Sequence, residues 1–188
     1  MSSFRVVGLV GLQAAGKTEV AKVFAELGVP CVRMGDVVIE EVRRRGLEVT
    51  ERTVGMTADE MRRKHGAGVI ARLNIPRIRE AGSGKRAVVV DGIRGIAEVN
   101  EFRGEFGESF ILCAVLAPAR LRFERVAGRR REDDAAGFAD FVEKDRRELS
   151  WGMGEAIALA DVFIVNDGTL EDLKEKAVEL FRRVVGEA

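Results

Sequence analysis

Short apolar runs bounded by glycine alternate along this sequence with longer stretches in which apolar residues recur at helical spacing. This alternation is typical of a parallel sheet whose strands are joined by crossover helices, so an α/β fold is expected. The apolar runs predict strands over residues 4–10, 30–33, 87–90, 110–116 and 162–165. The amphipathic stretches predict helices over residues 17–27, 36–45, 58–65, 68–81, 96–102, 119–129, 138–149 and 170–185.

One stretch departs from the alternation, because residues 36–85 carry helical patterns and no strand. No linker rich in proline or serine separates this stretch from the rest, so we expect a helical insertion that caps the sheet. A second, shorter insertion at residues 130–137 lies between two helical patterns. The 188 residues, 46% of them hydrophobic, fit a single domain over residues 1–188.

A glycine-rich segment follows the first predicted strand and opens the first predicted helix. It fits the pattern G-x-x-x-x-G-K-[ST] in the structural context that a phosphate-binding loop requires. Such a loop points backbone N–H groups at a phosphate, its lysine neutralises the β- and γ-phosphates, and its hydroxyl residue binds Mg²⁺. The alternative is an ordinary turn with a solvated lysine. The loop residues are Gly11, Leu12, Gln13, Ala14, Ala15, Gly16, Lys17 and Thr18.

The sequence also indicates which nucleotide and which metal to expect. The nearest candidate for the guanine-specific element N-K-x-D is Asn166-Asp167-Gly168-Thr169, which does not fit it. ATP is therefore the expected donor, with GTP as the alternative. No group of histidine, cysteine and aspartate has the spacing of a transition-metal site, so the expected metal is the Mg²⁺ that accompanies the nucleotide.

Two aspartates follow predicted strands. Asp91 ends the third strand, where a carboxylate can hold the hydration shell of Mg²⁺, and Arg94 can bind a phosphate of a second substrate. Asp36 follows the second strand and is a candidate for orienting or deprotonating the acceptor. For either aspartate the alternative is a helix N-cap.

These segments resemble nucleoside-monophosphate kinases, in particular adenylate kinases. Asp91-Gly92-Ile93-Arg94 is similar to their Asp-Gly-Phe-Pro-Arg segment, without the proline. Gly35-Asp36 is similar to their Gly-Asp segment, although Ile39 stands where they carry an arginine. The run from Ala160 to Gly168 instead resembles the fifth strand of dephospho-coenzyme A kinases. The combination looks most like a group of archaeal proteins related to adenylate kinases.

The resemblance covers almost the whole chain and implies a three-layer P-loop kinase fold with strand order 2-3-1-4-5. It also implies that Asn166 and Gly168 lie beside the adenine base, with strand-to-helix capping as the alternative. Arg125-Val126-Ala127-Gly128-Arg129 resembles the Arg-x-x-Gly-Arg segment of the adenylate kinase lid. Arg125 and Arg129 are therefore expected to close over the transferring phosphate from a lid at residues 120–150.

Two further features of the lid region have alternative interpretations. Arg122, Arg125 and Arg129 share one face of a predicted helix, which fits phosphate binding or a solvated basic face balanced by the acidic residues 132–134. Trp151 is expected to pack the lid against the core or to stack on a base.

Charge and cysteine content narrow the class of partner. The chain has 31 Lys and Arg against 31 Asp and Glu, which argues against binding to nucleic acid or to an anionic membrane. Cys31 and Cys113 lie in apolar runs and are expected to be buried thiols. The apolar runs fall short of the roughly 20 residues of a membrane span, and the start lacks a signal peptide, so a cytoplasmic protein is expected.

These observations together indicate ATP-dependent phosphoryl transfer to a nucleoside monophosphate or a dephospho-coenzyme A-like acceptor. Thr18 and Asp91 are the expected Mg²⁺ ligands, Asp91 through water. The rival interpretation is a nucleotide-binding regulatory protein or slow ATPase, which the isoleucine at position 39 favours. The expected catalytic residues are Lys17, Asp36, Arg94, Arg125 and Arg129.

Overall fold

The computed structural model describes residues 4–129 and 137–186. Within them, five parallel strands form one sheet of order β2-β3-β1-β4-β5, which confirms the expected order. The strands are β1 (Arg5–Val10), β2 (Cys31–Arg33), β3 (Ala87–Asp91), β4 (Phe110–Leu116) and β5 (Val162–Val165). The helices are α1 (Lys17–Glu26), α2 (Asp36–Arg44), α3 (Glu51–His65), α4 (Val69–Ala81), α5 (Ile96–Phe106), the 3₁₀-helix η1 (Gly107–Ser109), α6 (Ala119–Arg129), α7 (Phe138–Ser150), α8 (Met153–Ala158) and α9 (Leu170–Val185).

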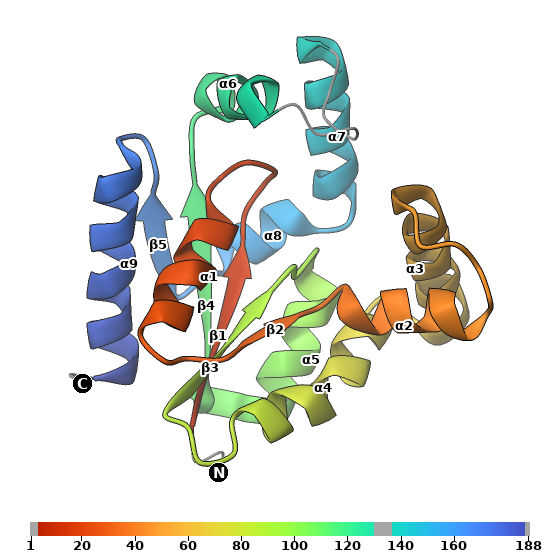
Figure 1. Cartoon of the computed structure of the whole chain (residues 1–188), viewed down its shortest axis with the longest axis horizontal. Helices are drawn as coiled ribbons and strands as arrows, with labels where there is room; N and C mark the ends of the chain where they lie inside the picture. Colours follow the sequence, from red (N-terminus) through yellow and green to blue (C-terminus); the bar gives the residue numbers. More distant parts are fainter. Residues whose placement is uncertain (1–3, 130–136, 187–188) are drawn as a thin grey trace.

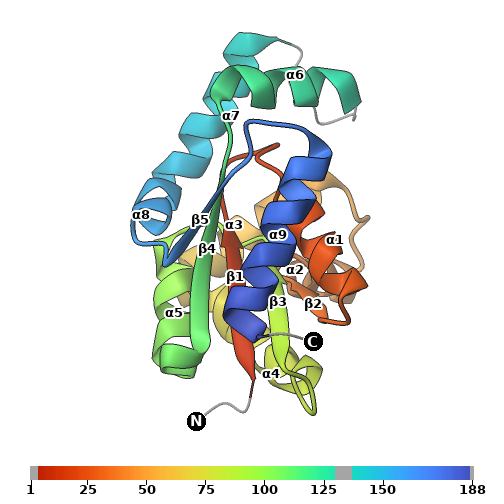
Figure 2. The same ribbon diagram turned by 90° about the vertical axis from the view of Figure 1, so that its left-hand side faces the viewer.

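Helices cover both faces of the sheet, as a three-layer fold requires. Helices α4, α5 and α8 pack on one face, and α1 and α9 pack on the other (Figure 1 and Figure 2). Successive strand residues point to opposite faces, so Val6 belongs to the first core and Val7 to the second. Because both faces are covered, the strands are continuous apolar runs rather than alternating ones.

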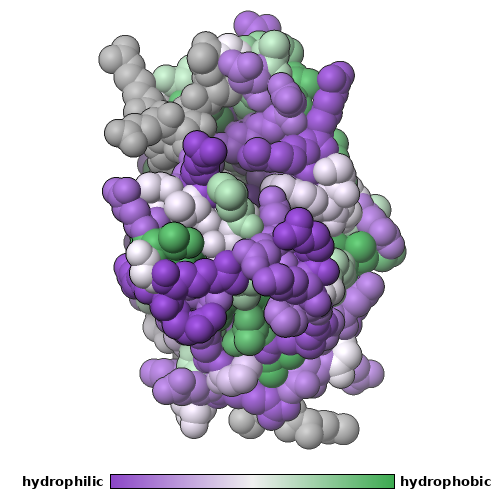
Figure 3. All heavy atoms as spheres, turned by 90° about the vertical axis from the view of Figure 1, so that its right-hand side faces the viewer, coloured by the Kyte–Doolittle hydropathy of each residue, from purple (hydrophilic) through white to green (hydrophobic). Residues whose placement is uncertain are grey.

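The helical insertion is present as α2, α3 and α4, and α2 and α3 extend beyond the β2 side of the sheet (Figure 1). The molecular face that carries these helices is mostly hydrophilic (Figure 3). Helix α3 begins at Glu51 rather than at residue 58, so the predicted start is wrong. The reason is a capping box, in which Thr50 Oγ1 accepts a hydrogen bond from the Thr53 N–H and Thr53 Oγ1 accepts one from the Thr50 N–H.

Other differences from the sequence prediction are local. Helix α5 continues to Phe106 instead of ending at residue 102, and the short helix α8 was not predicted. The expectation of buried thiols is wrong for Cys31, which is exposed on the edge strand β2, whereas Cys113 is buried on the interior strand β4. Edge strands leave one side uncovered, and the apolar run around residue 31 did not reveal that position in the sheet.

Helices α6 and α7 stand above the carboxyl end of the sheet, where the expected lid lies (Figure 1). Most of the predicted insertion at residues 130–137, including Arg130 and Arg131 of the basic cluster, lies outside the described residues. Within the described ranges, no helix is long and apolar enough to cross a membrane.

Candidate functional site

The loop between β1 and α1 has a backbone that only glycine accommodates at two positions. Gly11 and Gly16 have φ angles of +145° and +111°. A Cβ on Gly11 would lie 2.3 Å from the Val115 carbonyl oxygen, and one on Gly16 would lie 2.5 Å from Asn166 Nδ2. Gly16 is also the N-cap of α1, and it has no side chain that could accept a hydrogen bond from the first N–H groups of that helix. This arrangement fits a phosphate group at the helix N-terminus.

The Lys17 side chain is hydrogen-bonded to the backbone of its own loop. Its Nζ donates hydrogen bonds to the carbonyl oxygens of Gly11 at 2.5 Å and Leu12 at 3.1 Å. Burial lowers the pKa of Lys17, and the negative charges of Glu148 and Asp91 oppose that effect. Thr18 is exposed in the first turn of α1. A phosphate bound by the loop would therefore offer Lys17 a stronger, ionic partner than two carbonyl groups.

Asn166 connects three elements around the loop. Its side chain is buried, and Nδ2 donates to the Ala15 carbonyl oxygen at 2.8 Å. Its Oδ1 accepts a hydrogen bond from Arg125 Nη2 at 3.1 Å, so the end of β5 is joined to both the loop and α6. Helix α9 is capped by Thr169, so the capping alternative for Asn166 does not hold. Gly168 lies in the same turn, where a Cβ would meet Asp172 Oδ2 at 2.4 Å.

We expect Asn166→Ala to weaken ATP binding about tenfold, equivalent to roughly 1.4 kcal/mol. The substitution removes a buried hydrogen bond to the loop, so binding would have to order a looser backbone. Titration calorimetry with ATP and Mg²⁺ measures the effect, with the exposed neighbour Asp167→Ala as the control. Equal ATP affinities of Asn166→Ala and the parent protein would show that Asn166 does not support the nucleotide loop.

Helices α6 and α7 are anchored to the loop by a buried ion pair. Arg122 Nη1 and Nη2 donate to Asp145 Oδ1 at 2.9 Å and Oδ2 at 2.7 Å, and Gln13 Nε2 donates to the same Oδ1 at 3.2 Å. Arg122 is only 4% exposed, so its predicted place on a phosphate-binding face is wrong. Arg125 does face the loop, whereas Arg129 ends α6 and its side chain lies outside the described residues.

The two predicted acceptor-side aspartates do not cap helices. Gly35 is the N-cap of α2, and Gly95 is that of α5. Asp36 instead pairs with Arg33, with 3.2 Å between Oδ1 and Nη2. Asp91 ends β3 and acts electrostatically on Lys17. The capping alternatives therefore fail, and both carboxylates lie at the carboxyl end of the sheet.

Glu148 is a charged residue at this site that the sequence analysis missed. Its side chain is buried, and Oε1 accepts a hydrogen bond from Arg94 Nη1 at 3.0 Å. The negative charge of Glu148 also opposes the lowering of the Lys17 pKa by burial. Glu148 lies in a charged stretch of α7 with no motif around it, so only its depth in the fold distinguishes it.

Trp151 joins the insertion to α7. The guanidinium carbons of Arg62 and Arg147 lie 5.6 and 5.7 Å from the centre of its ring. Arg62 also lies near Glu98, with 3.5 Å between Nη2 and Oε1. Arginine stacking on tryptophan is favourable, so these contacts hold α3 close to the end of α7. Of the two roles expected for Trp151, packing is the one these contacts fit.

Because Glu98 is buried, we expect the free energy of unfolding of this protein to depend on pH. Burial raises the pKa of Glu98, although the Arg94 N–H and the Arg62 charge act in the opposite direction. The folded state therefore binds the proton more tightly than the unfolded state, so the free energy of unfolding falls as the pH rises from about 4.5 through the raised value. Urea unfolding of Glu98→Gln across this range should show a flatter pH profile. The exposed Glu108→Gln is the control, and an unchanged profile for Glu98→Gln would contradict the prediction.

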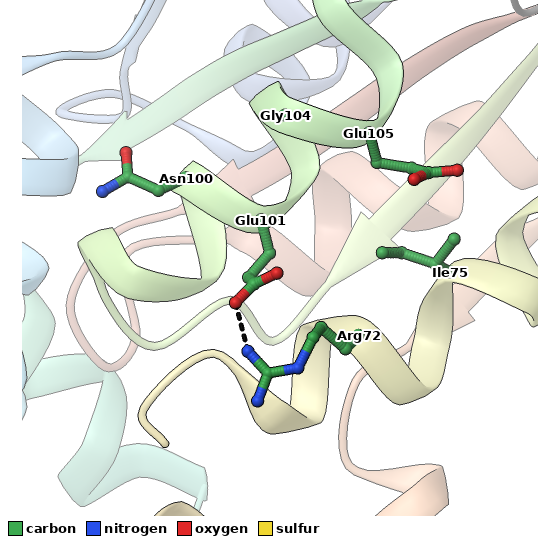
Figure 4. Close-up of a pocket in the computed structure, with 6 residues that line it drawn as sticks. All are labelled: Arg72, Ile75, Asn100, Glu101, Gly104 and Glu105. Atoms are coloured by element: carbon green, nitrogen blue, oxygen red, sulfur yellow. Dashed lines mark hydrogen bonds and ion pairs between the residues drawn. The ribbon is translucent and has the colours of Figure 1, made fainter. Parts of the chain in front are cut away.

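Two hollows lie in the described part of the chain, and only one of them borders the loop. One of about 410 Å³ lies between α4 and α5, where Arg72 and Glu101 form an ion pair, away from the loop (Figure 4). Another of about 260 Å³ lies against the loop and is mainly apolar, with Leu12, Leu116 and Ile157 among its walls. In the described residues no group of three or more His, Cys, Asp or Glu could hold a metal ion. Mg²⁺ at Thr18 and Asp91 would thus need phosphate oxygens among its ligands.

A parallel sheet of this order, with a phosphate loop after its central strand, defines the P-loop kinase fold. Solved structures agree, and each is less than 25% identical to this chain. They include TT1252 from Thermus thermophilus (TM-score 0.68, 18% identity, 97% and 99% of the two chains covered) and dephospho-CoA kinase from Campylobacter jejuni (0.65, 11%, 96% of each). Shikimate kinase from Acinetobacter baumannii, in complex with shikimate, has a TM-score of 0.58 at 21% identity, with 97% and 95% covered.

The chain belongs to the UPF0200 family, and residues 10–138 match the AAA domain family. The UPF0200 protein of Methanosarcina mazei is 47% identical over 171 residues, which are 91% of this chain and 90% of that protein. That of Thermococcus onnurineus is 39% identical over 183 residues, which are 97% and 99%. The UPF0200/UPF0201 protein of Archaeoglobus fulgidus is 46% identical over 180 residues, which are 96% of this chain and 56% of that longer protein.

Proposed function

We propose that this protein transfers the γ-phosphoryl group of ATP to a nucleotide-like small molecule. The observation that carries the proposal is that Lys17 and Arg94 follow neighbouring strands of the sheet, β1 and β3. Lys17 belongs to the loop that binds the donor phosphates, and Arg94 is the candidate for binding the acceptor. Neighbouring parallel strands end at the same edge of a sheet, so their order supports a donor and an acceptor bound next to each other.

On the donor side, residues 11–18 bind the phosphates through backbone N–H groups and Lys17. Thr18 would hold Mg²⁺ directly and Asp91 would hold it through water, and the ion would supply positive charge that neutralises the phosphates. Asn166 and Gly168 lie in the turn after β5, and we assign the adenine base to that turn. Arg125 contacts Asn166, which supports a role for its guanidinium group near the nucleotide.

On the acceptor side, the substrate enters over α2, α3 and α4 and meets Arg94 and Asp36. Arg125 and Arg129 close from the lid at residues 120–150. Transfer of a phosphoryl group through a loose transition state needs positioning and charge neutralisation more than covalent assistance. The lid also excludes water, which would otherwise accept the phosphoryl group.

The test is a transfer assay with ATP labelled at the γ-phosphate. The protein and Mg²⁺ are incubated with single acceptors: ribonucleoside 5′-monophosphates, dephospho-coenzyme A, shikimate or gluconate. Label that depends on Lys17 and enters a ribonucleoside 5′-monophosphate or dephospho-coenzyme A supports the proposal. Label in shikimate or gluconate alone would contradict a nucleotide-like acceptor. If no acceptor is labelled while slow ATP hydrolysis persists and Lys17→Ala abolishes it, the kinase proposal fails. A nucleotide-binding regulatory protein or slow ATPase, which Ile39 favours, would then be the better interpretation.

A further inference from the structure

One carboxylate oxygen of Glu148 is buried and has no hydrogen-bond partner among the described residues. The side chain is 6% exposed, and only Oε1 is used, in the contact with Arg94. The orphan atom is Oε2. A buried hydrogen-bond acceptor atom without a donor costs free energy, so most such atoms in folded proteins have a hydrogen-bond partner. A hydroxyl group of a bound molecule would supply that partner.

The position of Glu148 indicates which molecule supplies the hydroxyl. Arg94 follows β3, and Lys17 follows β1, which is the neighbour of β3 in the sheet. Glu148 contacts Arg94 and acts electrostatically on Lys17. In the proposed reaction Glu148 therefore lies beside Arg94, the candidate for binding the acceptor, and that arginine follows the strand next to the one that leads into the phosphate loop.

Asp36 is less well placed for the same task. It follows β2, which is two strand spacings, about 10 Å, from β1. It is also paired with Arg33. This position suits a residue that binds the acceptor at a distance from the transferring group.

We infer that Glu148 is the general base of the proposed kinase and that the acceptor group is an alcohol rather than a phosphate. This inference rests on the proposed function. The acceptor oxygen forms a bond to the γ-phosphorus while the bond from that phosphorus to the β–γ bridging oxygen breaks. The bridging oxygen keeps the electron pair and leaves with ADP, and the acceptor proton moves to Glu148 Oε2.

The negative charge of Glu148 favours an alcohol over a phosphate as the group that accepts the phosphoryl group. A phosphate that bound Arg94 would bring its negative charge against the buried carboxylate, and its oxygens already carry the charge needed to attack. An alcohol brings no charge and must lose a proton, which Oε2 can take. The buried carboxylate is therefore useful to an alcohol acceptor and unfavourable to a phosphate acceptor.

The experiment compares Glu148→Gln with the parent protein on the same acceptor panel. Glutamine keeps an oxygen for Arg94 but cannot take the proton, so kcat should fall at least about 100-fold while the Kd for ATP stays within about threefold. Glu148→Asp keeps a carboxylate and should recover part of kcat. Glu155→Gln, an exposed position on α8, is the matched control with unchanged activity. Urea unfolding of each variant separates loss of folding from loss of catalysis.

Phosphorus NMR of the product identifies the linkage. A phosphomonoester with a kcat that depends on Glu148 supports the inference. A phosphoanhydride product would overturn it and leave the kinase proposal intact. A phosphomonoester formed equally fast by folded Glu148→Gln, or a kcat that Asp36→Asn lowers and Glu148→Gln does not, would also overturn it. Failure of the parent protein to label any acceptor would instead refute the proposed function itself.

Discussion

Replacement of Lys17 by alanine is expected to lower the rate of phosphoryl transfer about 10²–10³-fold, the usual loss when one preorganised charge-stabilising group is removed. The Lys17 ammonium group is held on the loop by the carbonyl oxygens of Gly11 and Leu12, so its charge is preorganised where the γ-phosphate would bind. The transfer assay with saturating ATP measures kcat, and calorimetry measures the Kd for ATP.

The control for Lys17 is Lys22→Ala, an exposed lysine on the same helix that pairs with Glu19. It should change neither kcat nor the Kd for ATP by more than about twofold, because exposed ion pairs contribute little. A kcat of Lys17→Ala within about fivefold of the parent value would remove this lysine from the proposed mechanism.

Replacement of Asp145 by alanine is expected to lower the free energy of unfolding by about 3–5 kcal/mol, because it leaves the buried charge of Arg122 without its ionic partner. The side chains of Arg122 and Asp145 are 5% and 12% exposed, so water cannot replace the lost carboxylate. The same substitution removes one of two hydrogen bonds that Gln13 Nε2 donates, and the bond to the Phe141 carbonyl oxygen remains. Urea unfolding measures the change in free energy.

A matched ion pair lies on the outer side of α6, where Arg120 and Glu124 are 92% and 57% exposed. Glu124→Ala should lower the free energy of unfolding by less than about 1 kcal/mol. If Asp145→Ala were as stable as Glu124→Ala, the buried pair would not be what holds α6 and α7 to the loop.

Much of the fold could be predicted because strands and helices leave different apolar periods in a sequence. β4 and β5 have the predicted bounds, and β1, β2 and β3 differ from prediction by one residue at one end. The start of α3 was wrong because its first turns depend on the Thr50 cap rather than on an apolar face. The strand order came from the resemblance to known kinases, since apolar periods contain no information on which strands are neighbours.

The phosphate loop could be predicted because its chemistry is local, with all residues within one short segment. The partners of Arg122 and Arg94 could not be predicted, because each pair joins positions that are distant in sequence. Helical spacing placed Arg122 and Arg125 on one face, yet burial against α7 gave the former an internal partner. Charge alone does not distinguish a ligand-binding arginine from one that is buried in an ion pair.

The sequence by itself therefore determined the α/β alternation, the helical insertion and the loop with Lys17, because these depend on contacts between near neighbours in the chain. The tertiary structure decided which charges meet. It brought Glu148 of α7 into contact with Arg94, and it left one buried Glu148 oxygen without a partner among the described residues. That contact joins residues 54 positions apart, and only the packing of helices on the sheet brings such residues together.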